Sequence, residues 1–167
     1  NDPSKYPDHA KRNRSVTDYF EPGSVYKIVT ASAALNESKF KPQDKIFCEN
    51  GEYRVANHTL HDVHPYGLLS FKEVIAQSSN IGTTKIAQKI GPSLVYNYSK
   101  EFGFGETTSS GIPGEVGGVL KPVSRWSKTS IGAVPIGQEI CVTALQLASA
   151  IATIANNGIY MKPYILR

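Results

Sequence analysis

The sequence predicts an α+β fold that is mainly helical, with one short β-hairpin. An apolar run over residues 24–36 indicates a buried helix. Two capping boxes, Ser70–Glu73 and Thr143–Gln146, mark the starts of further helices. Asn50-Gly51, between KIFCE and EYRV, is typical of a type I′ hairpin. With 167 residues, of which 40% are hydrophobic and 19% are charged, the chain has the size and composition of one soluble globular domain.

The first part of the chain leads into the central helix. Residues 1–19 are polar, contain two prolines and have no periodicity, so we expect an extended lead-in. Pro22-Gly23 then forms a turn, and the helix at about 24–36 starts with Ser24 in its first turn. This helix is apolar on nearly every face, which is typical of a helix at the centre of a core.

Helices and breaks alternate in the middle of the chain. The capping box at Ser70 opens a helix that runs to about Gln77. A break over residues 78–80 follows, and a second helical stretch then continues to about Lys89. Gly91-Pro92 begins another helix, and Gly103 ends it.

The last third is predicted to be loop followed by one helix. Residues 103–142 are rich in glycine and proline and are expected to be mostly irregular. The apolar helix that starts at the second capping box ends at Asn157-Gly158. The terminal YMKPYIL is a candidate strand, so the expected strand content is small.

Charge and cysteine content exclude several functions. The net charge is +4, but the basic residues are scattered, and the cluster over residues 11–14 has no interleaved aromatic residues, so we expect no nucleic-acid binding. Cys48 and Cys141 are far apart and form no CxxC motif. They therefore indicate neither a metal site nor a disulfide framework. No run of about 20 apolar residues and no signal peptide are present in the sequence.

Ser24 and Lys27 have the spacing of a nucleophile and its base. Residues three apart on a helix share a face, so Lys27 can point back at the Ser24 hydroxyl. Burial lowers the pKa of a lysine, and a serine nucleophile needs a neutral base nearby. The same spacing at Ser38 and Lys41 lies in a polar loop and indicates solvated surface. The alternative for Ser24 is an ordinary helix start with a snorkelling lysine.

A second polar cluster lies at the break Ser78-Ser79-Asn80. A hydroxyl and a carboxamide two residues apart can face one cleft, with Ser78 relaying a proton and Asn80 binding a substrate amide or orienting a lysine. The alternative is structural, because breaks between helices favour serine and asparagine.

These two motifs, in this order, resemble the penicillin-binding transpeptidases, in particular the class B group. The matching stretches are RNRSVTDYFEPGSVYK, SSNIGTTKIA, GIPGE and GQEICVTALQLASAIATIANNG. The resemblance implies that Ser24 is the acylated nucleophile, that Lys27 is its base, and that Ser78 and Asn80 form the second active-site motif. It implies the mainly helical part of the β-lactamase/transpeptidase-like fold and no cofactor or metal.

The third motif of that family, Lys-Thr/Ser-Gly, does not occur in the sequence. The resemblance therefore implies a partial transpeptidase domain over residues 1–167, with a lead-in at 1–19 and a helical portion at 20–167. Most of the five-stranded sheet is expected to be absent, and the isolated chain is expected to be a poor or inactive acyl acceptor.

The resemblance implies a peptidoglycan D,D-transpeptidase that forms a serine acyl-enzyme with D-Ala-D-Ala stem peptides and is blocked by β-lactams. Two alternatives remain, a β-lactam sensor domain that does not turn over and a serine β-lactamase. The implied location is extracytoplasmic, with the parent protein anchored by an N-terminal transmembrane helix outside this chain. Divisome or elongasome proteins are the implied partners of that parent.

Three other features receive structural interpretations. His58, His61, Asp62 and His64 tempt a metal assignment, but Pro65-Tyr66-Gly67 favours a loop, with hydrogen bonds that stabilise it. We expect Trp126, next to Arg125, to have a packing role rather than to line the rim of a cleft. We expect Glu115 in GIPGE to fix a loop rather than to act as an acid.

Overall fold

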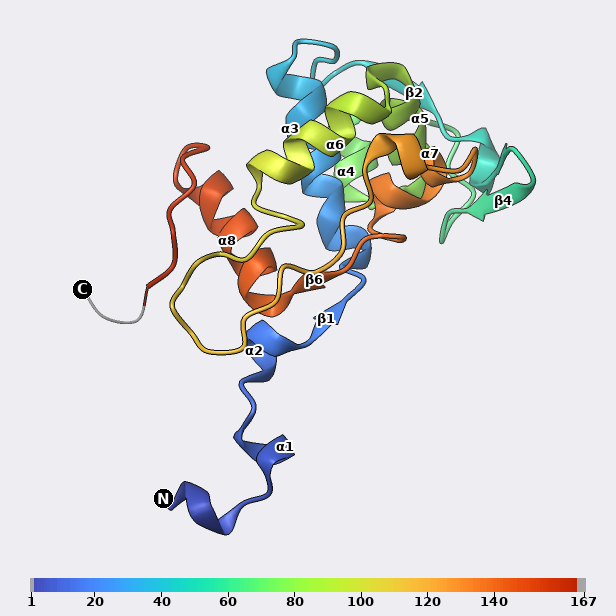
Figure 1. The fold of residues 1–167 in the computed structure, drawn as a ribbon. Coiled ribbons are helices and arrows are strands. Elements are labelled where there is room, and N and C mark those ends of the chain that lie inside the picture. Colours follow the sequence, from blue (N-terminus) through green and yellow to red (C-terminus); the bar gives the residue numbers. More distant parts are fainter. Residues whose placement is uncertain (1, 165–167) are drawn as a thin grey trace.

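The computed structural model describes residues 2–164, and α3 (Lys27–Asn36) packs against three other helices. Figure 1 shows α3 running through the middle of the body, beside α4, α5 and α6. The other principal helices are α4 (Phe71–Ala76), α5 (Asn80–Ile90), α6 (Pro92–Glu101), α7 (Ser130–Ala133) and α8 (Ala144–Ala155). The mainly helical α+β prediction is confirmed.

The central helix begins later than predicted. A 3-10 turn, η2 (Gly23–Tyr26), precedes α3, so Ser24 lies in this tighter turn rather than in the α-helix. Val29, Ala33 and Ala34 are fully buried, as expected of a central helix. The expectation of an apolar surface buried on nearly every side is wrong at the ends, because Val25 and Leu35 are about 40% exposed.

Six short strands form three two-stranded antiparallel sheets. β1 (Tyr19–Phe20) pairs with β6 (Val142–Thr143), β2 (Lys45–Phe47) with β5 (Leu68–Ser70), and β3 (Glu52–Val55) with β4 (His58–His61). The strand content is small, as predicted, but the single hairpin at Asn50-Gly51 is wrong. KIFCE pairs with a distant segment, and EYRV pairs with HTLH around a turn at Ala56-Asn57.

The Asn50-Gly51 signal belongs to a sharp turn instead. A 3-10 turn, η3 (Glu49–Gly51), has positive φ at all three residues, which Asn and Gly tolerate best. A Cβ atom on Gly51 would lie 2.9 Å from the Cα atom of Pro65. The glycine therefore permits close packing against the segment after β4, which a local hairpin rule does not register.

Both capping boxes are confirmed. At the start of α4, Glu73 N donates to Ser70 Oγ (3.2 Å) and Ser70 N to Glu73 Oε2 (2.7 Å). At the start of α8, Gln146 N donates to Thr143 Oγ1 (3.2 Å) and Thr143 N to Gln146 Oε1 (2.8 Å). Local side-chain chemistry thus fixes these two helix starts.

The region 103–142 is mostly irregular, as predicted, with three short helical segments: η4 (Val123–Arg125), α7 and η5 (Val134–Ile136). The interpretation of Glu115 is confirmed, because its carboxylate accepts hydrogen bonds from the backbone and side chains of Thr108 and Ser110. Trp126 is half-buried against the core and donates to Lys121 O (3.0 Å), which confirms its packing role.

The two ends of the chain differ from the prediction. The lead-in is not simply extended, since it holds η1 (Pro3–Lys5), α1 (Asp8–Lys11) and α2 (Arg14–Thr17). Figure 1 shows α1 projecting away from the body. The candidate strand YMKPYIL is irregular over 160–164, and the rest of it lies outside the described residues. Among residues 2–164 no helix has the length and apolarity needed to span a bilayer.

Candidate active site

Ser24 lies on an exposed turn that is held from one side. Gly23 has a φ of 56°, and its N–H donates to Gly137 O at 3.0 Å. Gly137 has a φ of 79°, and a Cβ atom there would lie 2.1 Å from Gly23 O. Only glycine at position 137 lets the segment after η5 approach the serine turn so closely. Ser24 itself is exposed to solvent.

Lys27 follows Ser24 by one turn but is buried. Its backbone N–H donates to Ser24 O, and its side chain is 2% exposed. The Nζ atom donates to Ser78 O (2.5 Å), Ser78 Oγ (2.9 Å) and Asn80 Oδ1 (2.8 Å). A lysine ammonium has three protons to donate, so these three acceptors match its capacity.

Burial lowers the pKa of Lys27 from an ordinary value of 10.5 to about 8, and the nearby Asp62 carboxylate opposes this by raising it. At pH 7 a pKa of about 8 leaves roughly a tenth of the lysine neutral, against less than about a thousandth for an ordinary lysine. The side chain is therefore poised to accept a proton near neutral pH.

Ser78 and Asn80 lie at the break between α4 and α5. Ser78 has a φ of 55°, a sparsely populated conformation for serine. Ser79 caps α5, because its Oγ accepts from Gly82 N at 2.8 Å. Asn80 Nδ2 donates to His61 O at 2.9 Å, which leaves Oδ1 facing Lys27.

The structure brings three of the four predicted residues into direct contact. Lys27, Ser78 and Asn80 form one hydrogen-bonded group, and Ser24 joins it through the backbone of η2 and α3. Within the part of the chain that the structure describes, the Ser24 hydroxyl makes no hydrogen bond, so the expected contact with Lys27 is not present. The Lys27 protons are directed at the 78–80 segment instead.

Sequence reasoning missed Asp62 in this site. The carboxylate accepts from Ser79 Oγ (2.6 Å), Asn80 N (2.5 Å) and Ile81 N (3.1 Å). His58 and His61 in the histidine-rich stretch lie on β4 rather than in a loop. Asp62 follows β4 directly and binds the start of α5. Among residues 2–164 no group of three metal-ligating side chains is found.

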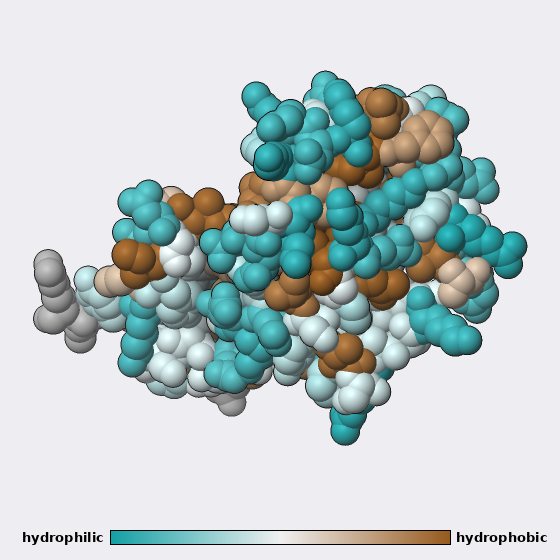
Figure 2. Space-filling view, turned by 90° about the horizontal axis from the view of Figure 1, so that it is seen from above, coloured by the Kyte–Doolittle hydropathy of each residue, from teal (hydrophilic) through white to brown (hydrophobic). Residues whose placement is uncertain are grey.

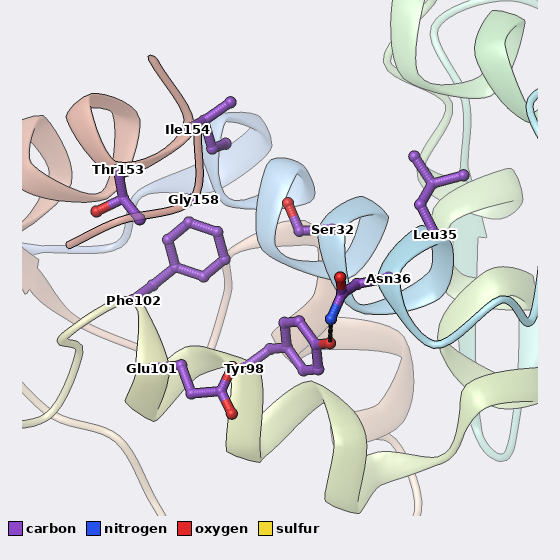
Figure 3. A pocket seen from close by; sticks show the side chains of 9 residues that line it. All are labelled: Ser32, Leu35, Asn36, Tyr98, Glu101, Phe102, Thr153, Ile154 and Gly158. Carbon is purple, nitrogen blue, oxygen red and sulfur yellow. Dashed lines mark hydrogen bonds between the residues drawn. The ribbon is translucent and has the colours of Figure 1, made fainter. Parts of the chain in front are cut away.

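Two of the surface cavities formed by the described residues are relevant to the site. One, of about 540 Å³, lies between the C-terminal parts of α3, α6 and α8, where Asn36 Nδ2 donates to Tyr98 Oη at 2.5 Å (Figure 3). None of the four predicted site residues lines it. The other, of about 420 Å³, includes Glu21, Gln138 and Glu139 and thus lies beside the Ser24 turn and Gly137. Figure 2 shows hydrophobic patches between hydrophilic side chains on the upper face.

Comparison with known proteins agrees with this geometry. Residues 1–167 match the family model described as penicillin binding protein transpeptidase domain. Penicillin-binding protein PbpB of Mycolicibacterium smegmatis is 38% identical over 96% of this chain and 25% of its own length. Peptidoglycan D,D-transpeptidase FtsI of Escherichia coli is 35% identical over 96% of this chain and 27% of its own length.

A solved structure shares the fold. Penicillin binding protein 3 of Mycobacterium tuberculosis, complexed with aztreonam, superposes with a TM-score of 0.87 at 35% identity, over 92% of this chain and 35% of that one. The chain spans about a quarter of the length of the curated relatives named above. From its match over every residue, the chain belongs to the penicillin-binding protein transpeptidase domain family, in its class B group.

Proposed function

We propose that the protein containing this chain is a peptidoglycan D,D-transpeptidase in which Ser24 is acylated by D-Ala-D-Ala stem peptides. The observation that carries the proposal is the buried Lys27, bound to Ser78 and Asn80 and one turn from an exposed serine. The name of the E. coli relative, a peptidoglycan D,D-transpeptidase, supports this reaction over the sensor and β-lactamase alternatives.

In the first step Ser24 Oγ attacks the carbonyl carbon of the penultimate D-alanine. The serine proton passes through Ser78 Oγ to the neutral Nζ of Lys27, which lies 2.9 Å from that hydroxyl. The C–N bond to the terminal D-alanine breaks, and the leaving amine takes up the proton. A Ser24 ester of the shortened stem peptide remains.

In the second step an amine of a neighbouring stem peptide attacks this ester. The new amide bond cross-links the two peptides, the amine loses a proton, and Ser24 Oγ regains one. Asn80 holds Lys27 in place through Oδ1 and has its Nδ2 group bound to His61 O, so we assign it an orienting role in both steps.

β-Lactams are the proposed covalent inhibitors, since a relative of known structure is described as complexed with aztreonam. Cross-linking of peptidoglycan places the reaction on the extracytoplasmic side of the membrane. We extend the proposal to an N-terminal membrane anchor in the parent protein and to divisome or elongasome partners.

Labelling of the complete protein with fluorescent penicillin tests the nucleophile. Ser24→Ala is expected to abolish labelling, whereas Ser38→Ala, which alters the surface Ser-x-x-Lys match, is expected to preserve it. Intact-protein mass spectrometry then locates the adduct. Equal labelling of Ser24→Ala and wild type would contradict the assignment. Release of D-alanine from a D-Ala-D-Ala stem peptide, with cross-linked product, distinguishes a transpeptidase from a sensor.

A further inference from the structure

Asp62 comes from a different part of the fold than the residues it holds. It follows β4 directly, and its backbone N–H donates to Gly51 O at 3.1 Å, which ties it to the turn before β3. Its half-buried carboxylate reaches the start of α5, which lies 17 to 19 residues later in the chain. The β3–β4 hairpin is thus joined to the second motif through this one side chain and the His61 carbonyl.

The three donors to Asp62 define the path of the motif. Ser79 Oγ, Asn80 N and Ile81 N all point at the carboxylate, and a negative charge at a helix N-terminus is favourable. Ser79 is fully buried, and its Oγ also accepts from Gly82 N, so this hydroxyl both donates to Asp62 and caps α5. The residues on either side, Ser78 and Asn80, are the ones that bind Lys27 Nζ.

We propose, resting on the proposed function, that Asp62 is a positioning residue that sets the geometry of Ser78 and Asn80 around Lys27. Its carboxylate binds Ser79 and the backbone of Asn80 and Ile81 rather than Ser24 or Lys27 Nζ. It acts through the 78–80 backbone and through its own negative charge. Loss of such support displaces groups that must meet the reacting atoms within a fraction of an ångström.

The charge of Asp62 has a second, measurable effect. Its carboxylate faces Lys27 from the loop after β4, whereas the other neighbours of Nζ, Ser78 and Asn80, are neutral. Asp62 acts to raise the pKa of Lys27 against the larger lowering by burial. Removing the charge should therefore lower this pKa and move the rising limb of the acylation pH profile to lower pH.

Two variants of the complete protein separate the effects. Asp62→Asn keeps the size but loses the charge, and its amide group cannot accept all three hydrogen bonds. We expect the pH-independent rate of acylation by fluorescent penicillin to fall about ten- to a hundredfold, with the limb at lower pH. Asp62→Glu keeps the charge but shifts the oxygens, so the rate should fall about tenfold with the limb unmoved. Glu73→Gln, which removes the same charge from the start of α4, is the matched control and should leave the profile unchanged.

A folded Asp62→Asn protein that is acylated at the wild-type rate would overturn the proposal. So would a folded Asp62→Asn protein in which the rising limb of the pH profile stays at the wild-type pH. If Asp62→Asn does not fold by circular dichroism, Asp62→Glu decides, and a wild-type rate in that variant overturns it. A ¹³Cε NMR titration of Lys27, assigned with Lys27→Met, needs no activity. If wild type is not acylated, the proposed function fails, and the titration still decides whether Asp62 acts on Lys27.

Discussion

The stability of the folded chain should depend on pH through Lys27 in a direction opposite to that of most salt-bridged lysines. The pKa of Lys27 is about 8 in the folded state, and an exposed lysine in the unfolded chain has the ordinary value of 10.5. Between these two values the unfolded chain binds more protons. The free energy of unfolding therefore rises as pH rises from about 8 toward 10.5.

The magnitude follows from the two pKa values. Below pH 8 the buried ammonium lowers the free energy of unfolding by about 3 kcal/mol relative to a lysine whose pKa is unchanged by folding. Between pH 7 and pH 10 about 2 to 3 kcal/mol of this is recovered. Lys27→Met removes the titrating group but keeps most of the apolar stem. The wild-type free energy of unfolding minus that of Lys27→Met should thus increase by this amount.

Urea denaturation of both proteins at pH 7, 8, 9 and 10 measures this difference. Every other titratable group is common to both proteins, so its contribution to this difference cancels. The loss of donors to Ser78 and Asn80 in Lys27→Met shifts the difference by a constant, so only its slope is diagnostic. A flat difference, or one that falls with pH, would refute the argument that burial sets the Lys27 pKa.

Three further predictions concern packing and the loops. Gly82→Ala should lower the free energy of unfolding, measured in urea, by about 1–2 kcal/mol, although alanine has the better helix propensity. The new Cβ would lie 2.6 Å from a methyl group of the stiff, fully buried Val74. A stabilised variant would contradict this. Gln146→Leu should lower the free energy of unfolding by about 2–4 kcal/mol in the same assay. The reason is that the buried amide donates to Glu106 O and Gly117 O and accepts from Thr143 N. A loss of less than about 1 kcal/mol would contradict this. Burial acts to raise the pKa of Glu115, but the hydrogen bonds to its carboxylate lower this pKa overall. Glu115→Gln should therefore be less stable than wild type at pH 7, and the difference in melting temperature between the two proteins should close as pH falls through the folded-state pKa. A gap that is independent of pH would argue against the charge.

The starts of α4 and α8 were predictable because their signals are local. The side chains of both capping boxes close on backbone groups three residues away, so the sequence contains both halves of each interaction. The hairpin was not predictable from Asn50-Gly51. The turn at these residues packs against Pro65, and the strand before it pairs with Leu68–Ser70, both of which are tertiary choices. The true hairpin turns at Ala56-Asn57, where alanine with a φ of 53° gives no sequence signal.

The candidate site divides in the same way. The residue types and spacing of Ser24, Lys27, Ser78 and Asn80 indicated acyl transfer by a serine. Lys27, Ser78 and Asn80 are in contact, as expected. What holds them is distributed over the chain and has no local pattern. Asp62 lies in a histidine-rich stretch that suggests metal binding, yet its partners are backbone and hydroxyl donors at the start of α5. An acceptor for a helix N-terminus can come from any loop that passes by.

Gly137 shows why the turn of Ser24, the proposed nucleophile, and the C-terminal third of the chain act as one unit. Its backbone carbonyl accepts from Gly23 N, and any side chain at this position would collide with the same turn. Glu139 N donates to Glu21 Oε1 at 2.9 Å, so two contacts tie the residues before Ser24 to the segment between η5 and β6. The β1–β6 pairing continues this contact through Tyr19–Thr143 and Phe20–Val142. Because Lys27 is fixed on the other side by the 78–80 segment, Ser24 stands between two independent supports. Its hydroxyl can remain free of hydrogen bonds and exposed while its backbone position is determined, which is the condition a nucleophile needs before substrate arrives.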